Sequence, residues 1–117
     1  MKVLLVNGSS RKNGCTNAAL AEVARALHEE GVETEAFFIG NEALPDCTGC
    51  RKCRETGRCV FDDAVNRFVG QAWHTDGFVF GSPFYFAHPS ARLLAFMDRA
   101  FYSGGDAFAY KPAAAVL

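Results

Sequence analysis

The sequence has no apolar run long enough to cross a bilayer and no marked excess of charge of either sign. Its formal net charge is -1 at pH 7, so the composition gives no support for a nucleic-acid-binding surface or for anchoring to anionic lipid. Met1 and Lys2 lead directly into an apolar run, which is unlike a secretory signal peptide. We therefore expect a cytoplasmic protein that binds neither nucleic acid nor membranes.

Internal repeats and low-complexity tracts are absent as well, and the length suits a single domain over residues 1–117. Cysteine is the unusual component. There are five cysteines, an odd number, and four of them fall between Cys47 and Cys59. The odd number of cysteines, their clustering and the lack of an export signal disfavour a secreted disulfide framework. The cysteines therefore indicate metal or redox chemistry.

The segment from Val3 to Ala19 is typical of a strand, an anion-binding loop and a helix. Val3 to Val6 form a continuous apolar run, which favours a strand buried on both faces of a parallel sheet. Gly8 and Gly14 permit tight turns before a helix that begins near Thr16. The free amides of the first helical turn, the helix dipole and short hydroxyl groups together predict an anion site.

Two familiar phosphate loops are excluded by the spacing of the glycines. Five residues separate Gly8 from Gly14 and Cys15 follows, whereas a Walker loop has four residues between its glycines and then Lys and Ser or Thr. No glycine stands two residues after Gly8, so the GxGxxG dinucleotide fingerprint is absent. The loop is either a site for a terminal monophosphate or a serine-rich turn that only caps a helix.

Hydrophobic periodicity predicts the remaining elements. Helices are expected over Asn17–Glu30, from Ala64 to about Trp73, and from Ser90 to about Phe101 before a turn that begins at Ser103. Strands are expected over Glu33–Ile39, Asp76–Gly81 and Ala113–Leu117. Asp62, Asp63 and Ser90 are placed to cap helices, and Gly31 is placed for a left-handed cap at the end of the first helix. Trp73 is expected in the core.

Strands that alternate with helices predict an α/β fold with a doubly wound parallel sheet and right-handed crossovers. With the strand order 2-1-3-4, the loops after the first and third strands face one crevice at the carboxyl ends of the strands, where such sheets bind ligands. The second of these loops, SPFYFAHP, is rich in aromatic residues and proline. A shared mononucleotide ligand is the simplest interpretation.

Three blocks of sequence resemble a known family. They are GSSRKNGCTNAAL at Gly8–Leu20, CTGCRKCRETGRCVFDD at Cys47–Asp63 and GSPFYFAHPSARLLAFMDR at Gly81–Arg99. Together they resemble the flavodoxin-like NADPH-dependent FMN reductases, and more closely the branch that includes the iron-sulfur flavoproteins. The resemblance implies a flavodoxin-like fold that binds FMN.

The resemblance also implies roles for individual residues. It places Ser9, Arg11, Cys15, Thr16 and Asn17 around the FMN phosphate. Cys15 departs from the family pattern, which more often has Asn or Ser there, although its backbone amide can still serve. It places Ser82, Pro83, Phe84, Tyr85 and Phe86 against the isoalloxazine ring and ribityl chain. Aromatic rings and backbone amides suit a flat heterocycle with polar edges, although core packing is the alternative for these rings.

The cysteine motif resembles the compact cluster motif of the iron-sulfur flavoproteins. Cys47, Cys50 and Cys53 recur at every third residue, and Cys59 follows after five more residues. Thiolates at this spacing can hold a 4Fe-4S cluster, whereas zinc modules usually present two separated pairs of ligands. Because many similar relatives work as plain flavoproteins, a cluster and a loop without one both stay open.

We therefore expect an FMN-dependent oxidoreductase that passes electrons from NAD(P)H to an unknown acceptor, with no catalytic side-chain acid or base. One alternative is an electron carrier in which FMN exchanges electrons with a cluster, and another is a non-enzymatic metal-binding or interaction module. The final strand, ending at Leu117, would be an uncovered sheet edge. We thus expect either a C-terminally incomplete domain without its last strand and helices, or a homodimer or higher homo-oligomer.

Overall fold

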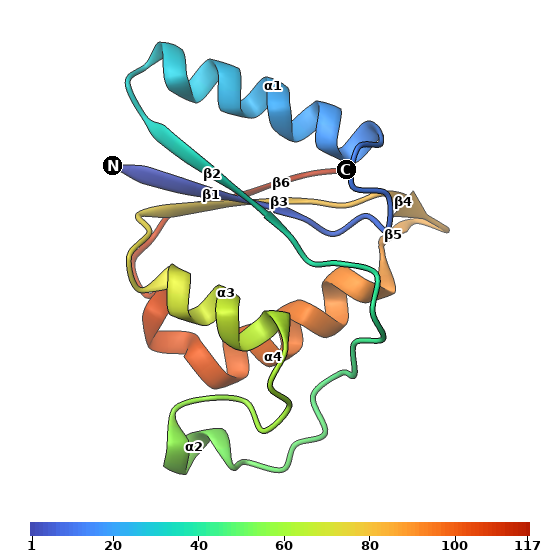
Figure 1. The fold of residues 1–117 in the computed structure, drawn as a ribbon, viewed down its shortest axis with the longest axis vertical. Coiled ribbons are helices and arrows are strands. Elements are labelled where there is room, and N and C mark those ends of the chain that lie inside the picture. The colour runs from blue at the N-terminus through green and yellow to red at the C-terminus, as the bar shows by residue number, and fades with distance from the viewer.

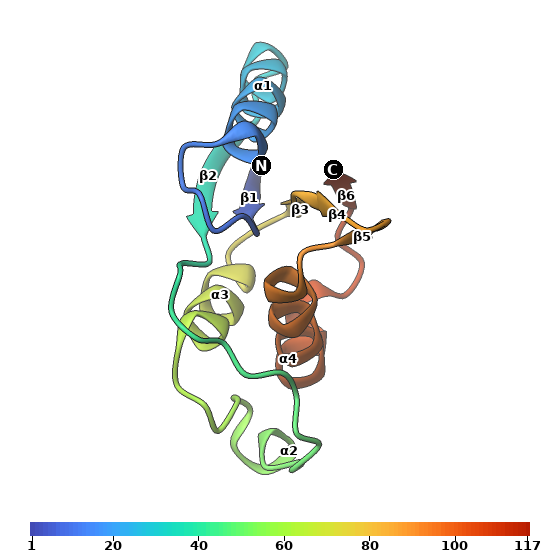
Figure 2. The same cartoon turned by 90° about the vertical axis from the view of Figure 1, so that its right-hand side faces the viewer.

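Four parallel strands form the middle layer of the molecule, whose computed structural model describes residues 1–117 (Figure 1). They are β1 (Lys2–Asn7), β2 (Glu33–Phe38), β3 (Gly77–Gly81) and β6 (Ala113–Val116). Helix α1 (Cys15–Glu29) covers one face of the sheet, while α3 (Ala64–Ala72) and α4 (Ala91–Phe108) cover the other (Figure 2). The order β2-β1-β3-β6 confirms the predicted order 2-1-3-4 and the flavodoxin-like fold class.

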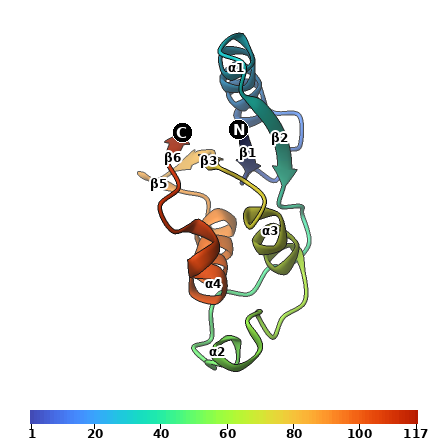
Figure 3. The same ribbon diagram turned by 90° about the vertical axis from the view of Figure 1, so that its left-hand side faces the viewer.

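Three smaller elements were not expected from the sequence. Helix α2 (Cys53–Thr56) is a single turn within the cysteine-bearing segment, and β4 (Phe84–Tyr85) pairs with β5 (His88–Pro89) in an antiparallel hairpin. Figure 3 shows that α2 lies beyond the α3 and α4 layer, at the end of the molecule away from α1. The hairpin lies at the sheet end where α4 begins.

The larger core lies between the sheet and the α3 and α4 layer. Its centre is Phe68, a fully buried ring whose centroid is 4.9 Å from that of Phe96 and 5.4 Å from that of Phe37. On the opposite face, Leu5 and Val79 pack against Leu20 of α1 in a smaller cluster. Alternation along β1 and β3 thus gives each face of the sheet its own apolar contacts, as a strand buried on both faces requires.

The predicted helix ends are confirmed at three positions. The Asp63 carboxylate accepts a hydrogen bond from the Val65 amide at 3.0 Å, and the Ser90 hydroxyl accepts one from the Leu93 amide at 3.2 Å. Gly31, just past α1, has a φ of +76°, the left-handed conformation that glycine adopts without strain.

The structure corrects the expected turn from Ser103. Helix α4 continues to Phe108 and only kinks, at Gly104, where φ is -127° and ψ is 27°. Gly104 is buried directly against the Val69 side chain of α3, and a Cβ there would overlap it. Gly104 therefore permits close helix packing, and the helix kinks there instead of ending.

Trp73 is also placed differently from the expectation. It follows the last residue of α3 and is 57% exposed, whereas Ala72 is fully buried. Because consecutive residues of a helix are about 100° apart, the burial of Ala72 turns Trp73 toward solvent. The expectation that Trp73 packs in the core is wrong.

The sheet edge formed by the last strand was expected to be uncovered. Strand β6 forms one edge of the sheet, and Ala113, Ala114 and Ala115 are all exposed. The edge is therefore uncovered over these residues, as expected.

None of the helices combines the length and the apolar character that crossing a membrane requires.

Candidate flavin site and cysteine cavity

The loop between β1 and α1 is shaped by a buried asparagine that the sequence argument did not single out. The Asn7 side chain accepts a hydrogen bond from the Ser9 amide at 2.9 Å and donates one to the Lys12 carbonyl at 3.3 Å. Ser9 is buried, and its hydroxyl accepts a hydrogen bond from the Arg11 amide at 3.0 Å. The last residue of the strand therefore fixes both sides of the loop.

Helix α1 begins without a side-chain cap. Gly14 is its N-cap residue, its first turn has no acidic side chain, and the first three amides, from Cys15 to Asn17, have no backbone partner. Thr16 is 8% exposed, and its hydroxyl makes no hydrogen bond within the chain but is not shut off from solvent. Unpaired amides, the positive end of the helix dipole and a free hydroxyl are the components of an anion-binding site.

The second loop is tied to the first by a serine. The Ser90 hydroxyl donates to the Gly8 carbonyl at 2.8 Å, and the Gly8 amide donates to the Gly81 carbonyl at 2.8 Å. The Ser82 hydroxyl donates to the Pro83 carbonyl and accepts from the Ser90 amide, both at 2.8 Å. Because its hydroxyl is used locally, Ser82 orders the loop rather than offering that hydroxyl to a ligand.

The two loops enclose one open cavity of about 410 Å³ at the carboxyl ends of β1 and β3. Seven of the ten predicted flavin-site residues line it: Ser9, Arg11, Cys15, Thr16, Ser82, Pro83 and Tyr85. The others do not. Asn17 lines a separate groove between α1 and β2, and Phe84 and Phe86 lie in the hairpin beside the cavity.

The hairpin turn carries backbone strain. Phe86 and Ala87 both have positive φ, 45° and 67°, although neither is glycine. Phe86 is 99% exposed, so no packing in the chain fixes this ring and the core alternative is wrong for it. Strain of this kind often lies at functional sites, where a bound molecule or the surrounding structure stabilises it.

The four clustered cysteines line a second, much smaller cavity at the other end of the molecule. Cys47, Cys50, Cys53 and Cys59 face it together with side chains of α4, including Arg99 and Tyr102. All are free thiols, and no three of the chain's Cys, His, Asp and Glu side chains form a ready ligand set for one metal ion.

The four thiols of this cavity are chemically suitable ligands for an iron-sulfur cluster. A cubane cluster takes one thiolate on each of its four irons, and all four thiols border one space. That space, about 20 Å³, holds about one water molecule, so the exposed cysteine segment would have to widen around a cluster. The pKa of the Arg99 guanidinium beside it is lowered by burial, but hydrogen bonds to Asp63 and Cys59 outweigh this and raise it.

The two cavities lie at different positions along α4. The flavin-site loops meet α4 at Ser90, whereas the cysteine cavity adjoins Arg99, nine residues further along. At a rise of 1.5 Å per residue, the two positions are separated by roughly 14 Å along the helix axis. The molecule therefore carries two distinct candidate sites on one helix.

A family model for NADPH-dependent FMN reductases matches the whole of residues 1–117. The chain belongs to this family. The iron-sulfur flavoprotein of Methanocaldococcus jannaschii is 39% identical to this chain over 99 residues, covering 85% of this chain and 51% of that protein. The iron-sulfur flavoprotein of Methanosarcina thermophila is 31% identical over 111 residues, covering 95% of this chain and 58% of that protein.

Solved structures of a flavoenzyme and of a flavone reductase share the fold of this FMN reductase family member. The NAD(P)H:(acceptor) oxidoreductase of Paracoccus denitrificans aligns with a TM-score of 0.68 at 22% identity, covering 98% of this chain and 59% of that one. A flavone reductase aligns with a TM-score of 0.65 at 22% identity, covering 85% and 29%. The chain spans about half the length of the curated relatives it matches.

Proposed function

We propose that this chain is the FMN-binding part of an oxidoreductase that passes electrons from NAD(P)H to an acceptor. The observation that carries the proposal is the meeting of two loops, far apart in sequence, around one cavity beside an uncapped helix N-terminus. That cavity lies at the carboxyl ends of parallel strands, where α/β sheets bind nucleotides. Membership of the FMN reductase family supports the same ligand.

Each part of the cavity has a role in this proposal. The free amides from Cys15 to Asn17, the Thr16 hydroxyl and the Arg11 charge would bind the phosphate. The Tyr85 ring and the backbone of the second loop would hold the flat ring system. Bound FMN supplies the hydride and electron chemistry, so the chain only has to bind the cofactor, orient it and leave one ring face open.

A comparison of FMN with riboflavin tests the phosphate site. Arg11→Ala should weaken FMN binding roughly tenfold, about 1.4 kcal/mol, and leave riboflavin binding unchanged, because riboflavin has no phosphate. Arg25→Ala is the matched control, since Arg25 lies in the exposed middle of α1 and pairs with Glu22 and Glu29. Fluorescence titration of each ligand measures the affinities. Equal affinity of wild-type protein for FMN and riboflavin contradicts the proposal.

A second candidate function, an electron carrier that holds FMN and a 4Fe-4S cluster, is favoured by the four thiols around one cavity. Anaerobic purification followed by absorption spectroscopy and iron assay separates the candidates. Flavin absorption alone supports the reductase, and added broad absorption with about four irons per chain supports the carrier. A colourless protein that takes up neither FMN nor iron rejects both and leaves a binding module.

A further inference from the structure

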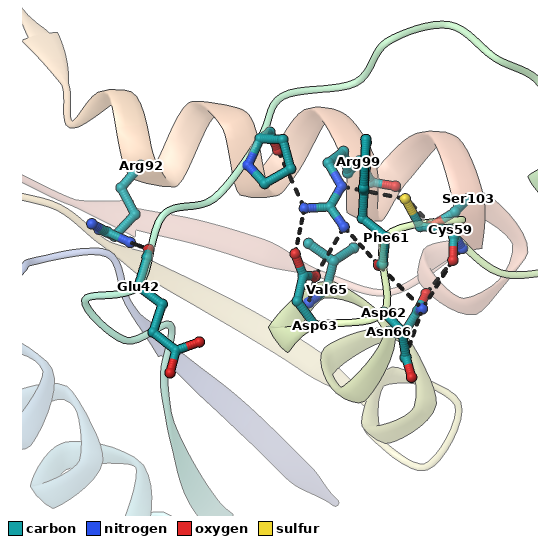
Figure 4. Close-up of polar contacts among 11 residues, drawn as sticks. Glu42, Cys59, Phe61, Asp62, Asp63, Val65, Asn66, Arg92, Arg99 and Ser103 are labelled. Carbon is teal, nitrogen blue, oxygen red and sulfur yellow. Dashed lines mark hydrogen bonds and ion pairs between the residues drawn. The ribbon is translucent and has the colours of Figure 1, made fainter.

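One buried side chain anchors both ends of the cysteine segment. Arg99 of α4 is 1% exposed, and its guanidinium donates to the Pro45 carbonyl at 3.2 Å and to the Phe61 carbonyl at 2.9 Å (Figure 4). Pro45 lies two residues before Cys47, and Phe61 lies two residues after Cys59. A single charged group therefore closes the segment that contains all four clustered cysteines.

The remaining donors of Arg99 are also used. Asp63 accepts two of its N–H groups, at 2.8 and 2.9 Å, and the Cys59 sulfur accepts the Nε–H at 3.3 Å (Figure 4). A guanidinium has five N–H donors, and each has an acceptor here. Loss of any part of the guanidinium therefore leaves at least one of these partly buried acceptors without its charged donor.

Cys59 differs from the other three cysteines in this respect. Its sulfur is the one that contacts a charged donor; the Cys53 thiol only approaches the Tyr102 carbonyl, at 3.9 Å. Its backbone is held separately by Asn66, which accepts from the Cys59 amide at 2.9 Å and donates to its carbonyl at 3.0 Å. Backbone placement and the sulfur contact can thus be perturbed independently.

We propose that Arg99 is the positioning residue of the cysteine segment, and that its Nε–H bond to the Cys59 sulfur raises the reduction potential of a cluster held there. The proposal rests on the cluster-holding function proposed above. Hydrogen bonds to ligand sulfurs withdraw electron density from a cluster and are one of the factors that set its potential. A buried positive charge acts in the same direction, because it favours the reduced, more negative state.

The test uses the full chain reconstituted anaerobically with iron and sulfide. Arg99→Lys keeps the positive charge but replaces the planar fork with a single ammonium, which cannot reach all five acceptors. We expect a lower cluster potential in Arg99→Lys than in wild-type protein, measured by redox titration. Asn66→Ala should loosen the backbone at Cys59 without lowering the potential. Arg92 lies on the same helix but donates to the Asn41 and Glu42 carbonyls. Arg92→Lys should therefore change neither the cluster potential nor the backbone at Cys59.

A second experiment, hydrogen exchange, does not depend on a cluster. Hydrogen exchange of the metal-free protein should show faster exchange of the amides from Cys47 to Cys59 in Arg99→Lys, with no change in Arg92→Lys. Unchanged exchange in a folded Arg99→Lys protein overturns the positioning role. If the cluster potential of Arg99→Lys is lowered no more than that of Asn66→Ala, the role of the Nε–H bond is overturned. Wild-type protein that assembles no cluster overturns the redox part together with the carrier function, while the exchange result still decides positioning.

A third measurement needs no variant that might fail to fold. In wild-type protein labelled with nitrogen-15 arginine, the buried Nε–H of Arg99 should give a slowly exchanging NMR signal that shifts or broadens when the paramagnetic cluster is assembled. The absence of any such protected signal overturns the proposal.

Discussion

Gly81→Ala provides a sharp test of how the fold positions the candidate flavin site. Gly81 is the last residue of β3, and the first turns of α1 lie directly over it. A Cβ added there would lie 2.8 Å from Leu20 Cδ1 and 2.9 Å from Thr16 Cγ2. Carbon atoms in contact are normally 3.5–4.0 Å apart, so α1 or its side chains must move.

The expected cost follows from two opposing effects. Overpacking of this kind destabilises a protein by about 1–3 kcal/mol, whereas replacing glycine reduces the entropy of the unfolded chain and recovers about 0.5–1 kcal/mol. We therefore expect the free energy of unfolding to fall by about 1–2 kcal/mol in urea denaturation with an unchanged m-value. Because Thr16 must shift, FMN affinity should fall as well.

Gly70→Ala is the matched control. Gly70 lies in the exposed side of α3 with open space around its Cα, so alanine meets no atom within 4 Å. Alanine there should stabilise the protein by about 0.5–1 kcal/mol through helix propensity and leave FMN binding unchanged. If Gly81→Ala matches wild-type protein in stability and FMN affinity, the close approach of α1 to β3 does not constrain the site.

Three further substitutions test other parts of the structure. Asp63→Ala leaves the buried Arg99 charge without its carboxylate and should lower the free energy of unfolding by about 3 kcal/mol in urea, while a loss under 1 kcal/mol would contradict a stabilising ion pair at Arg99. Hydrogen bonds from Asn66 and Arg58 lower the pKa of Asp62 below its ordinary 3.8, so Asp62→Asn should be less stable than wild-type protein at neutral pH. That difference should close as the pH falls below 4 through the lower folded pKa, and a difference that persists at pH 2 would refute the assignment. Ala87→Gly should increase the free energy of unfolding by up to about 1 kcal/mol, because glycine relieves the strain of the positive φ, and the melting temperature should rise slightly. A clearly lower melting temperature would show that the hairpin is not strained.

Local signals in the sequence were enough for most of the fold. Apolar runs and helical periodicity located the four parallel strands and the three long helices, because burial imposes those periods on the chain. Caps at Asp63, Ser90 and Gly31 were predictable since each depends on residues within a few positions. The turn predicted at Ser103 failed because Gly104 lies against Val69, a contact between helices that no local pattern contains.

The candidate flavin site divides in the same way. The residue types of both loops and the strand order sufficed to predict one shared crevice, since parallel strands place their carboxyl ends at one edge. The sequence did not reveal that Ser90 joins the loops through the Gly8 carbonyl, or that the Ser82 hydroxyl is used within its own loop. These hydrogen bonds connect segments about eighty residues apart or depend on one rotamer, so no spacing rule predicts them.

The resemblance of three sequence blocks identified the family by itself, and the alternation of strands and helices was enough to predict the parallel α/β fold. The FMN site and the cysteine-held cluster that the sequence suggests stay predictions. Only the tertiary structure decided that Arg99 reaches the Cys59 sulfur and both ends of the cysteine segment. The physical reason is distance along the chain. Spacing encodes contacts between near neighbours, whereas the partners of a buried charge are chosen by how α4 packs on the rest of the molecule.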